Sequence, residues 1–213
     1  MNARKITIAA SFVAAALALS GCNAGNAETP TQRPSRETSA SPTTTSQSPK
    51  PTPSNKNEYK PASAAGPAEN VPVPKMTAEA NEKTEKGAEA FLEHYLKMMN
   101  YAFESYETTE LVELSSGECD VCYENVIFGI EFNAKQGGWQ SGGGYKFKIY
   151  SVKTTESESL LGFSMTKEAS VLYQAGGTVA SKSDKQVKPI HAVALLKFSN
   201  GWIVESISII DEQ

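Results

Sequence analysis

Apolar and polar residues alternate with the period of an α-helix between Thr77 and Glu107. The apolar ones recur at steps of three and four residues and would form a single stripe: Phe91, Leu92, Tyr95, Met99, Ala102, Phe103 and Tyr106. A helix with one buried face has this spacing. Glu79 and Glu82 make the first turn acidic, which suits the positive end of the helix dipole. His94 lies beside the polar flank of the stripe, where we expect it to be solvated.

Two shorter helices are expected next. The first covers residues 109–114, and the second follows a pair of cysteines and covers residues 123–135. The positions that this last helix would bury are Val126, Ile127, Ile130 and Phe132. Gly137 and Gly138 are expected to end it, because glycine weakens a helical backbone.

The pattern then changes to the period of two that is typical of β-strands. "YKFKIYSVKTT" alternates apolar residues with lysines, and "LLGFSMTKEASVLYQAGG" indicates one long strand with a bulge near residues 167–169. "KPIHAVALLKFSNGWIVESISII" indicates a hairpin that turns at Asn200-Gly201, a dipeptide that tight hairpin turns favour. The glycine-rich "QGGWQSGGGYKF" lacks the ending of a phosphate-binding loop, so we interpret it as a turn and bulge. Three helices followed by four antiparallel strands predict an α+β domain with the helices on one face of a curved sheet.

A separate apolar run, residues 6–20, follows a short basic stretch at the start of the chain. Its length suits the core of a signal peptide, about 7 to 15 residues, and is less than the roughly 20 residues that cross a bilayer. The run ends in Leu19-Ser20-Gly21-Cys22, which resembles a bacterial lipobox. This resemblance implies that residues 1–21 are removed and that Cys22 carries a diacylglycerol. The protein would then be lipid-anchored on the extracytoplasmic face of the cell membrane.

Residues 22–75 are expected to form the lipidated cysteine and a disordered tether. Ten of the eleven prolines of the chain lie there among serines and threonines, with few large apolar residues. Burial in such a segment cannot offset the entropy of ordering its backbone. The α+β domain is therefore expected to cover residues 76–213.

Charge limits the partners of this domain. Residues 76–213 hold 20 acidic residues and 12 lysines, a net charge near −8, and no arginine. Phosphate backbones favour bidentate guanidinium contacts, so an acidic domain without arginine is not expected to bind nucleic acid. The predicted partners are the membrane, through Cys22, and an unidentified envelope protein or small ligand.

Cys119 and Cys122 form a C-x-x-C pair within "SSGECDVCYENV". Lipidation of Cys22 would leave them as an even pair in an oxidising location, which favours a structural disulfide. Closing this small loop stabilises by about 2 kcal/mol on the chain-entropy model, and we expect the bond to join the second and third helices. Two alternatives stay open. A redox centre needs a stabilised thiolate, which the neighbouring Glu118 and Asp120 disfavour, and a zinc site needs about four ligands.

From about Val73 to Gln213 the chain resembles an uncharacterised family of actinobacterial lipoproteins, the domain of unknown function 6318. Three pieces in order carry the resemblance: "VPVPKMTAEANEKTEKGAEAFLEHYLKMMNYAFES", "LSSGECDVC" and "GGWQSGGGY". The order of helices and strands is also similar to the cone-shaped nuclear transport factor 2-like fold. The resemblance implies a surface-anchored domain with a paired C-x-x-C, and it supplies no activity and no catalytic residues.

Two classes of function follow from the cone that this resemblance implies. In the first, a non-catalytic domain binds a ligand or partner in a pocket whose candidate residues are His191, Glu205, Tyr95, Tyr145 and Trp139. In the second, His191 and Glu205 perform the acid–base chemistry of an isomerase or dehydratase. Each of these residues is also a normal component of a core or strand edge. We expect the non-catalytic class, with no cofactor and no metal, and an open polar concavity would favour the enzyme.

Overall fold

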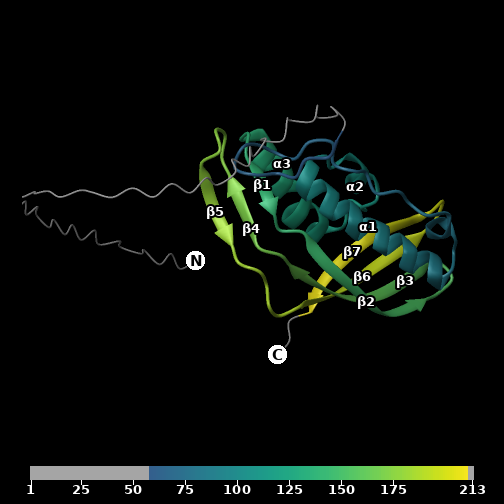
Figure 1. Cartoon of the computed structure of the whole chain (residues 1–213). Helices are drawn as coiled ribbons and strands as arrows, with labels where there is room; N and C mark the ends of the chain where they lie inside the picture. Colours follow the sequence, from purple (N-terminus) through teal and green to yellow (C-terminus); the bar gives the residue numbers. More distant parts are fainter. Residues whose placement is uncertain (1–57, 211–213) are drawn as a thin grey trace, which may run out of the picture. The chain divides into compact units, whose positions relative to one another are not determined.

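The computed structural model describes residues 58–210 (Figure 1). The predicted signal peptide, Cys22 and residues 22–57 of the predicted tether lie outside the described residues. The helical elements are η1 (Ala78–Asn81), α1 (Glu85–Ser105), α2 (Thr109–Glu113), η2 (Val121–Ile127) and α3 (Phe128–Lys135). The strands are β1 (Trp139–Gly142), β2 (Tyr145–Thr154), β3 (Glu158–Lys167), β4 (Ser170–Tyr173), β5 (Val179–Ser183), β6 (Ile190–Phe198) and β7 (Trp202–Ile210). No helix within residues 58–210 is both long and apolar enough to cross a membrane.

The long helix α1 begins later than the apolar pattern indicates. Residues 78–81 form a 3₁₀ turn, and Thr84 caps α1 by accepting a hydrogen bond from the backbone N of Gly87 at 3.0 Å. A Cβ atom on Gly87 would lie 2.0 Å from the backbone O of Glu82. The chain therefore folds back onto the first turn of α1 at a position that only glycine permits. The helix ends at Tyr106, whose left-handed backbone (φ 65°) donates its N–H to Ala102 O.

The strands form two antiparallel sheets instead of the predicted single sheet of four strands. One sheet has the order β2-β3-β6-β7 and the other the order β1-β4-β5. The predicted long strand over residues 160–177 is divided between them, because the chain leaves β3 after Lys167 and re-enters as β4 at Ser170. The glycine-rich stretch supplies β1, and Gly142 and Gly143 (φ 72° and 82°) form the turn toward β2. The hairpin of β6 and β7 is confirmed.

The core lies between the helices and the larger sheet. The buried stripe of α1 includes Phe91, Tyr95 and Leu96, and it packs in one cluster with Phe163 of β3 and Leu196 of β6. Two layers that bury one face each make the mixed α+β class that the pattern predicted. Figure 1 shows the helices gathered on one side of β2, β3, β6 and β7.

The folded unit includes residues that composition assigned to the tether. Lys60 and Glu69 pair through two backbone hydrogen bonds, which fold residues 58–70 into a loop. This loop lies against β1, where the indole N–H of Trp139 donates to Ser63 O and the hydroxyl of Ser141 donates to Ala62 O, both at 2.8 Å. The described structure therefore begins before the expected boundary at residue 76. Hydrogen bonds to backbone carbonyls hold this segment, and they need no large apolar side chains.

Candidate functional site

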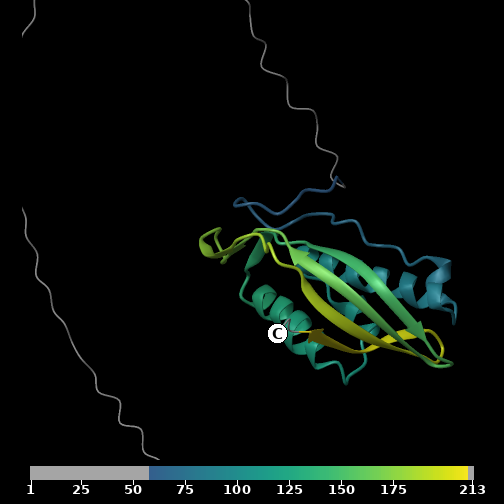
Figure 2. The ribbon, with the colours of Figure 1, turned by 90° about the horizontal axis from the view of Figure 1, so that it is seen from below.

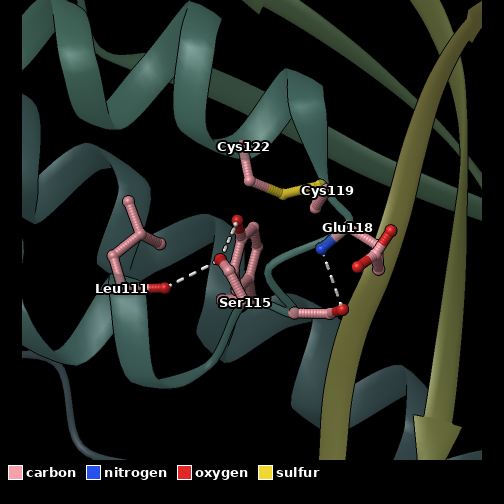
Figure 3. Close-up of a disulfide and its surroundings, with 7 residues drawn as sticks. Leu111, Ser115, Glu118, Cys119 and Cys122 are labelled. Carbon is pink, nitrogen blue, oxygen red and sulfur yellow. Dashed lines mark hydrogen bonds between the residues drawn. A yellow bond between two sulfur atoms is a disulfide. The ribbon is translucent and has the colours of Figure 1, made fainter.

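Cys119 and Cys122 form a disulfide, as predicted (Figure 3). Cys119 lies at the end of the linker that leaves α2, and Cys122 lies in the first turn of η2. The bond therefore ties the linker to the start of η2 and does not join two helices as predicted. Both cysteines are buried, at 0% and 1% exposure, so an attacking thiolate has no path to either sulfur. This burial favours the structural interpretation of the pair.

Tyr95 belongs to the buried core and lines the same small gap as Cys122. Its hydroxyl is 2.9 Å from Ser115 Oγ, and Ser115 Oγ in turn lies 2.8 Å from Leu111 O (Figure 3). Ser115 has a single hydroxyl proton and donates it to that carbonyl, so Tyr95 is the donor to Ser115. Burial raises the pKa of Tyr95 to about 12. The predicted pocket residue Tyr95 thus anchors α1 to the end of α2.

A surface groove of about 770 Å³ lies between α2 and the helical segment formed by η2 and α3. We call it the α2–η2 groove, and its lining residues are Val112, Tyr123, Glu124, Asn125, Ile127, Phe128 and Glu131. Phe128 is 65% exposed. The hydroxyl of Thr108 donates to Glu131 Oε1 at 3.2 Å, which holds that carboxylate at the edge of the groove. The two charged lining residues, Glu124 and Glu131, are both acidic.

The η2 segment, which forms one wall of the α2–η2 groove, has an unusual backbone. Residues 121–127 have π-helical hydrogen bonding before the chain continues as α3. Such segments are rare, and they occur frequently at functional sites. The segment places Glu124, Phe128 and Glu131 on the groove, which the largely buried Ile127 also lines, while Ile130 is buried in the core.

The burial of the third helix was predicted in part. Ile127 and Ile130 are buried as expected, whereas Phe132 is 52% exposed and packs against Phe128, with ring centroids 6.1 Å apart. The prediction for Phe132 was wrong because the π-helical turn shifts the faces of this segment. The spacing of Phe128 and Phe132 by four residues was a signal for a paired aromatic surface.

His94 is buried and is not solvated as expected. Its side chain is 3% exposed, and its Nε2 lies 3.1 Å from Glu110 Oε1 of α2. A carboxylate only accepts hydrogen bonds, so Nε2 carries the proton and donates it. Nδ1 has no partner among the described residues. The histidine therefore fastens α2 to α1, and its position three residues after Phe91 on the buried stripe was the available signal.

His191 and Glu205 are not brought together. His191 pairs with Ile210 across the hairpin, whereas Glu205 lies at a bulge beside Leu195 and Leu196. The two residues are roughly 15 Å apart along the strands, at about 3.4 Å per residue. A hydrogen bond from Lys197, at 2.7 Å, lowers the pKa of the Glu205 carboxyl. A catalytic general acid needs the opposite shift.

The other two predicted pocket residues, Trp139 and Tyr145, also lie in separate places. Trp139 is buried in the smaller sheet, where it stacks on Tyr173 with ring centroids 5.5 Å apart. Tyr145 begins β2, and its ring lies 5.7 Å from that of Phe103 and 6.0 Å from Lys167 Nζ. Burial raises the pKa of Tyr145. The five predicted pocket residues therefore do not line one site.

The space between the helices and the larger sheet is almost filled. A gap of about 40 Å³ remains there, and ten residues line it: Tyr95, Leu96, Met99, Val121, Cys122, Val126, Phe163, Met165, Ile207 and Ile209. Pockets for small molecules usually measure about 300 to 1,000 Å³. Within residues 58–210, no group of three or more His, Cys, Asp or Glu side chains is placed to hold a metal ion.

The chain matches one protein family over nearly all of its described residues. The model of the "Family of unknown function (DUF6318)" covers residues 57–208. No curated protein matches the chain. Among solved structures, the intermembrane space region of the chloroplast protein ARC6 is similar, with a TM-score of 0.47 and 15% sequence identity. That likeness covers 61% of this chain and 98% of that chain, and its score is too low to carry a conclusion.

Proposed function

The chain belongs to the family of unknown function DUF6318, and we propose that it is a non-catalytic, membrane-anchored domain that binds a partner protein through the α2–η2 groove. The observation that carries the proposal is the groove itself, with an exposed aromatic side chain between two carboxylates. Anchoring at the extracytoplasmic face of an actinobacterial membrane follows from the lipobox-like motif at Cys22 and from the sequence resemblance.

The fold-level part of the proposal is a cone of the nuclear transport factor 2 type. It is supported by the order of the elements, helices before strands, and by α1 packing on one face of the antiparallel sheet β2-β3-β6-β7. In such a cone the ligand site would lie between helix and sheet, where this chain has the 40 Å³ gap. The binding function is therefore proposed for the outer surface of the helices.

The alternative function, acid–base catalysis, has less support. It needs ionisable groups that converge on a site with room for a substrate. His191 and Glu205 lie in different parts of the hairpin, and apolar side chains fill the space beside Tyr95. The other two groups considered, the buried disulfide and the buried Tyr95–Ser115 hydroxyl pair, are of kinds that stabilise a fold, so neither supports catalysis.

The chemistry of the groove defines the partner. Apolar contact with Phe128 and Ile127 requires an apolar side chain, and Glu124 and Glu131 favour a lysine or arginine on either side of it. An amphipathic helical segment presents these two kinds of residue at spacings of three and four. We therefore assign the groove to a basic amphipathic segment of another envelope protein.

This assignment is tested by titrating residues 51–213 with a synthetic peptide of about 14 residues, leucine and lysine in a helical amphipathic pattern. Binding is followed by nuclear magnetic resonance of the backbone amides. We expect saturable shifts at residues 112 and 123–131, and we expect both Phe128→Ser and Glu124→Lys to weaken binding at least about fivefold. A loss of this size corresponds to about 1 kcal/mol, typical of one residue at an interface.

Matched controls separate the groove from general attraction between a basic peptide and an acidic domain. Val187→Ser removes another exposed apolar residue, and Glu107→Lys makes the same charge change outside the groove. Both controls should bind like the wild type. Equal weakening by Glu107→Lys and Glu124→Lys, or shifts spread over the acidic surface, would refute the assignment to the groove.

Anchoring is tested in cells that express the whole chain. Cys22→Ala should prevent lipidation, so the protein should leave the membrane fraction or accumulate as a larger precursor. Cys122→Ser is the control, because it removes a cysteine of the folded domain, one half of the disulfide, and should leave fractionation unchanged. Identical mobility and membrane association of Cys22→Ala and wild type would contradict lipid anchoring, and this result would leave the groove experiment unaffected.

A further inference from the structure

A second surface lies on the sheet β2-β3-β6-β7, on the face opposite to α1. Figure 2 shows these strands in front of α1. We call this surface the outer sheet face, and the residues that define it are Lys146, Lys148, Tyr150 and Lys153 of β2, Leu160 of β3, and Val193 and Leu195 of β6. The strand register places them together, since Lys153 pairs with Leu160 and Leu160 pairs with Leu195. Tyr150 is 49% exposed and Leu160 is 47% exposed.

A bulge sets the position of the aromatic ring. The register between β2 and β3 shifts between Ile149 and Ser151, which leaves Tyr150 as the extra residue. Its ring lies over Gly162, where a Cβ atom would be 2.6 Å from Tyr150 Cε2. The ring centroid is also 5.9 Å from that of His191. Gly162 thus allows an exposed tyrosine to lie across the sheet.

The charges of the domain are distributed unevenly along the chain. Residues 58–144, which include the helices, hold 15 acidic residues and 6 lysines, whereas residues 145–210 hold 5 acidic residues and 8 lysines. On the outer sheet face, Lys146 pairs with Glu168 at 2.8 Å, and Lys148 and Lys153 form no ion pair with the described residues. Glu158 and Glu205 lie beside Lys197, at the same end of this face as Lys153 and Leu160.

We propose that the outer sheet face docks against an anionic lipid membrane. The lysines of β2 would contact the headgroups, and Tyr150 and Leu160 would enter the interface, where aromatic and apolar side chains are favourable. The acidic helices lie on the opposite layer, farther from the lipid than the Debye length of about 8 Å at physiological salt, so their repulsion is screened. This proposal goes beyond the partner-binding function, because it uses a different face and needs no lipid on Cys22.

The same residues have two alternative roles, and each predicts a different behaviour. Lysines on an edge strand also prevent pairing with other strands, and this role would require no lipid. A second copy of the chain would bring the lysines of both copies together if the same faces met. Like charges directly opposite each other destabilise such a contact, which favours the membrane as the occupant.

The proposal is tested by sedimenting residues 51–213 with vesicles of phosphatidylglycerol and phosphatidylcholine in equal parts, and with vesicles of phosphatidylcholine alone. This fragment has its own core and contains the family match, and it lacks Cys22 and the apolar run. We expect binding to the anionic vesicles that decreases with added salt. Each lysine of β2 changed to glutamine should lower the partition coefficient about fivefold, and Leu160→Ser should lower it further.

The matched control changes three lysines of the helical layer, Lys86, Lys97 and Lys135, to glutamine. These lie on α1 and α3 and give the same net charge as the variant of Lys146, Lys148 and Lys153. Circular dichroism is used to check that each variant is folded. Equal binding by the two triple variants, or no binding of the wild type to anionic vesicles, overturns the proposal. A dimer in sedimentation equilibrium that Leu160→Ser dissociates would assign the face to a second copy and would also overturn it.

Discussion

The hydroxyl groups of Tyr95 and Ser115 form a short buried chain that ends at Leu111 O. Tyr95 is 1% exposed and Ser115 is 5% exposed, so water replaces neither partner. The three groups lie on different segments: Tyr95 on α1, Leu111 on α2, and Ser115 on the linker to the disulfide. The pair therefore fixes the distance between α1 and the segment that carries Cys119.

Tyr95→Phe should lower the free energy of unfolding by about 1 kcal/mol at pH 7, because one buried hydrogen bond is lost. The dependence on pH should also change. Burial raises the pKa of Tyr95 from 10.0 to about 12, so between these values the unfolded chain loses its proton before the folded chain does. The stability from this group is complete below about pH 10 and is lost as pH rises toward 12, by up to about 2 to 3 kcal/mol.

Urea unfolding at about pH 7, 10 and 11 measures both effects. Tyr95→Phe should start less stable than wild type and lose less stability above the ordinary tyrosine pKa, with a remaining loss from Tyr145 and Tyr106, whose pKa values burial also raises. Tyr150→Phe is the control, since it removes a half-exposed hydroxyl. Parallel stability curves for Tyr95→Phe and wild type across this range would contradict the role assigned to Tyr95.

At the scale of elements, helical periodicity predicted the buried stripe of α1 and the short α2. It did not predict where α1 begins, because the first turn depends on the cap at Thr84 and on the close approach of Glu82 O to Gly87. Periodicity reports which side chains are buried, whereas these two features are contacts of the backbone. His94 was misplaced for a related reason, since its partner Glu110 comes from another helix.

The strands were likewise predicted only in part. Alternation of apolar residues predicted β2, β3, β6 and β7, which each bury one face. β5 was missed because all five of its residues are exposed and give no pattern. The division between β3 and β4 was also missed, since both parts alternate in the same way and only their partners differ.

The candidate site was less predictable than the fold. Composition and spacing predicted the disulfide, whose two cysteines are close in sequence and bonded in the structure. The pairing of His191 with Glu205 failed because the register of the hairpin, with its bulge at Glu205, separates them. The α2–η2 groove was not predicted at all, since its walls come from two helices whose distance the sequence does not reveal.

At the scale of the whole molecule, the loop over residues 58–70 extends the folded unit beyond its compositional boundary. Its contacts to the domain include the hydrogen bond from Trp139 to Ser63 and a hydrogen bond from the Tyr59 hydroxyl to Glu104 of α1. Ala64 O also lies close to Gly177, where a Cβ atom would be 2.9 Å from it. These contacts use carbonyl groups and single side chains, so a segment rich in proline and alanine can form them.

The same loop should contribute measurably to stability. Removing residues 58–72 from the 51–213 fragment should lower the free energy of unfolding by about 1 to 3 kcal/mol, because it exposes Trp139 and leaves its N–H without Ser63 O. Trp139→Phe removes the N–H and keeps an aromatic ring beside Tyr173. Urea unfolding of the wild type, both single variants and the combined variant forms a double-mutant cycle. We expect a coupling of about 1 kcal/mol, since the same hydrogen bond is lost in each variant.

Ser141→Ala, whose partner is Ala62 O, should give a second coupling of similar size with the truncation. Additive losses in both cycles, or no loss on truncation, would mean that the loop is not part of the folded unit and that the boundary at residue 76 holds.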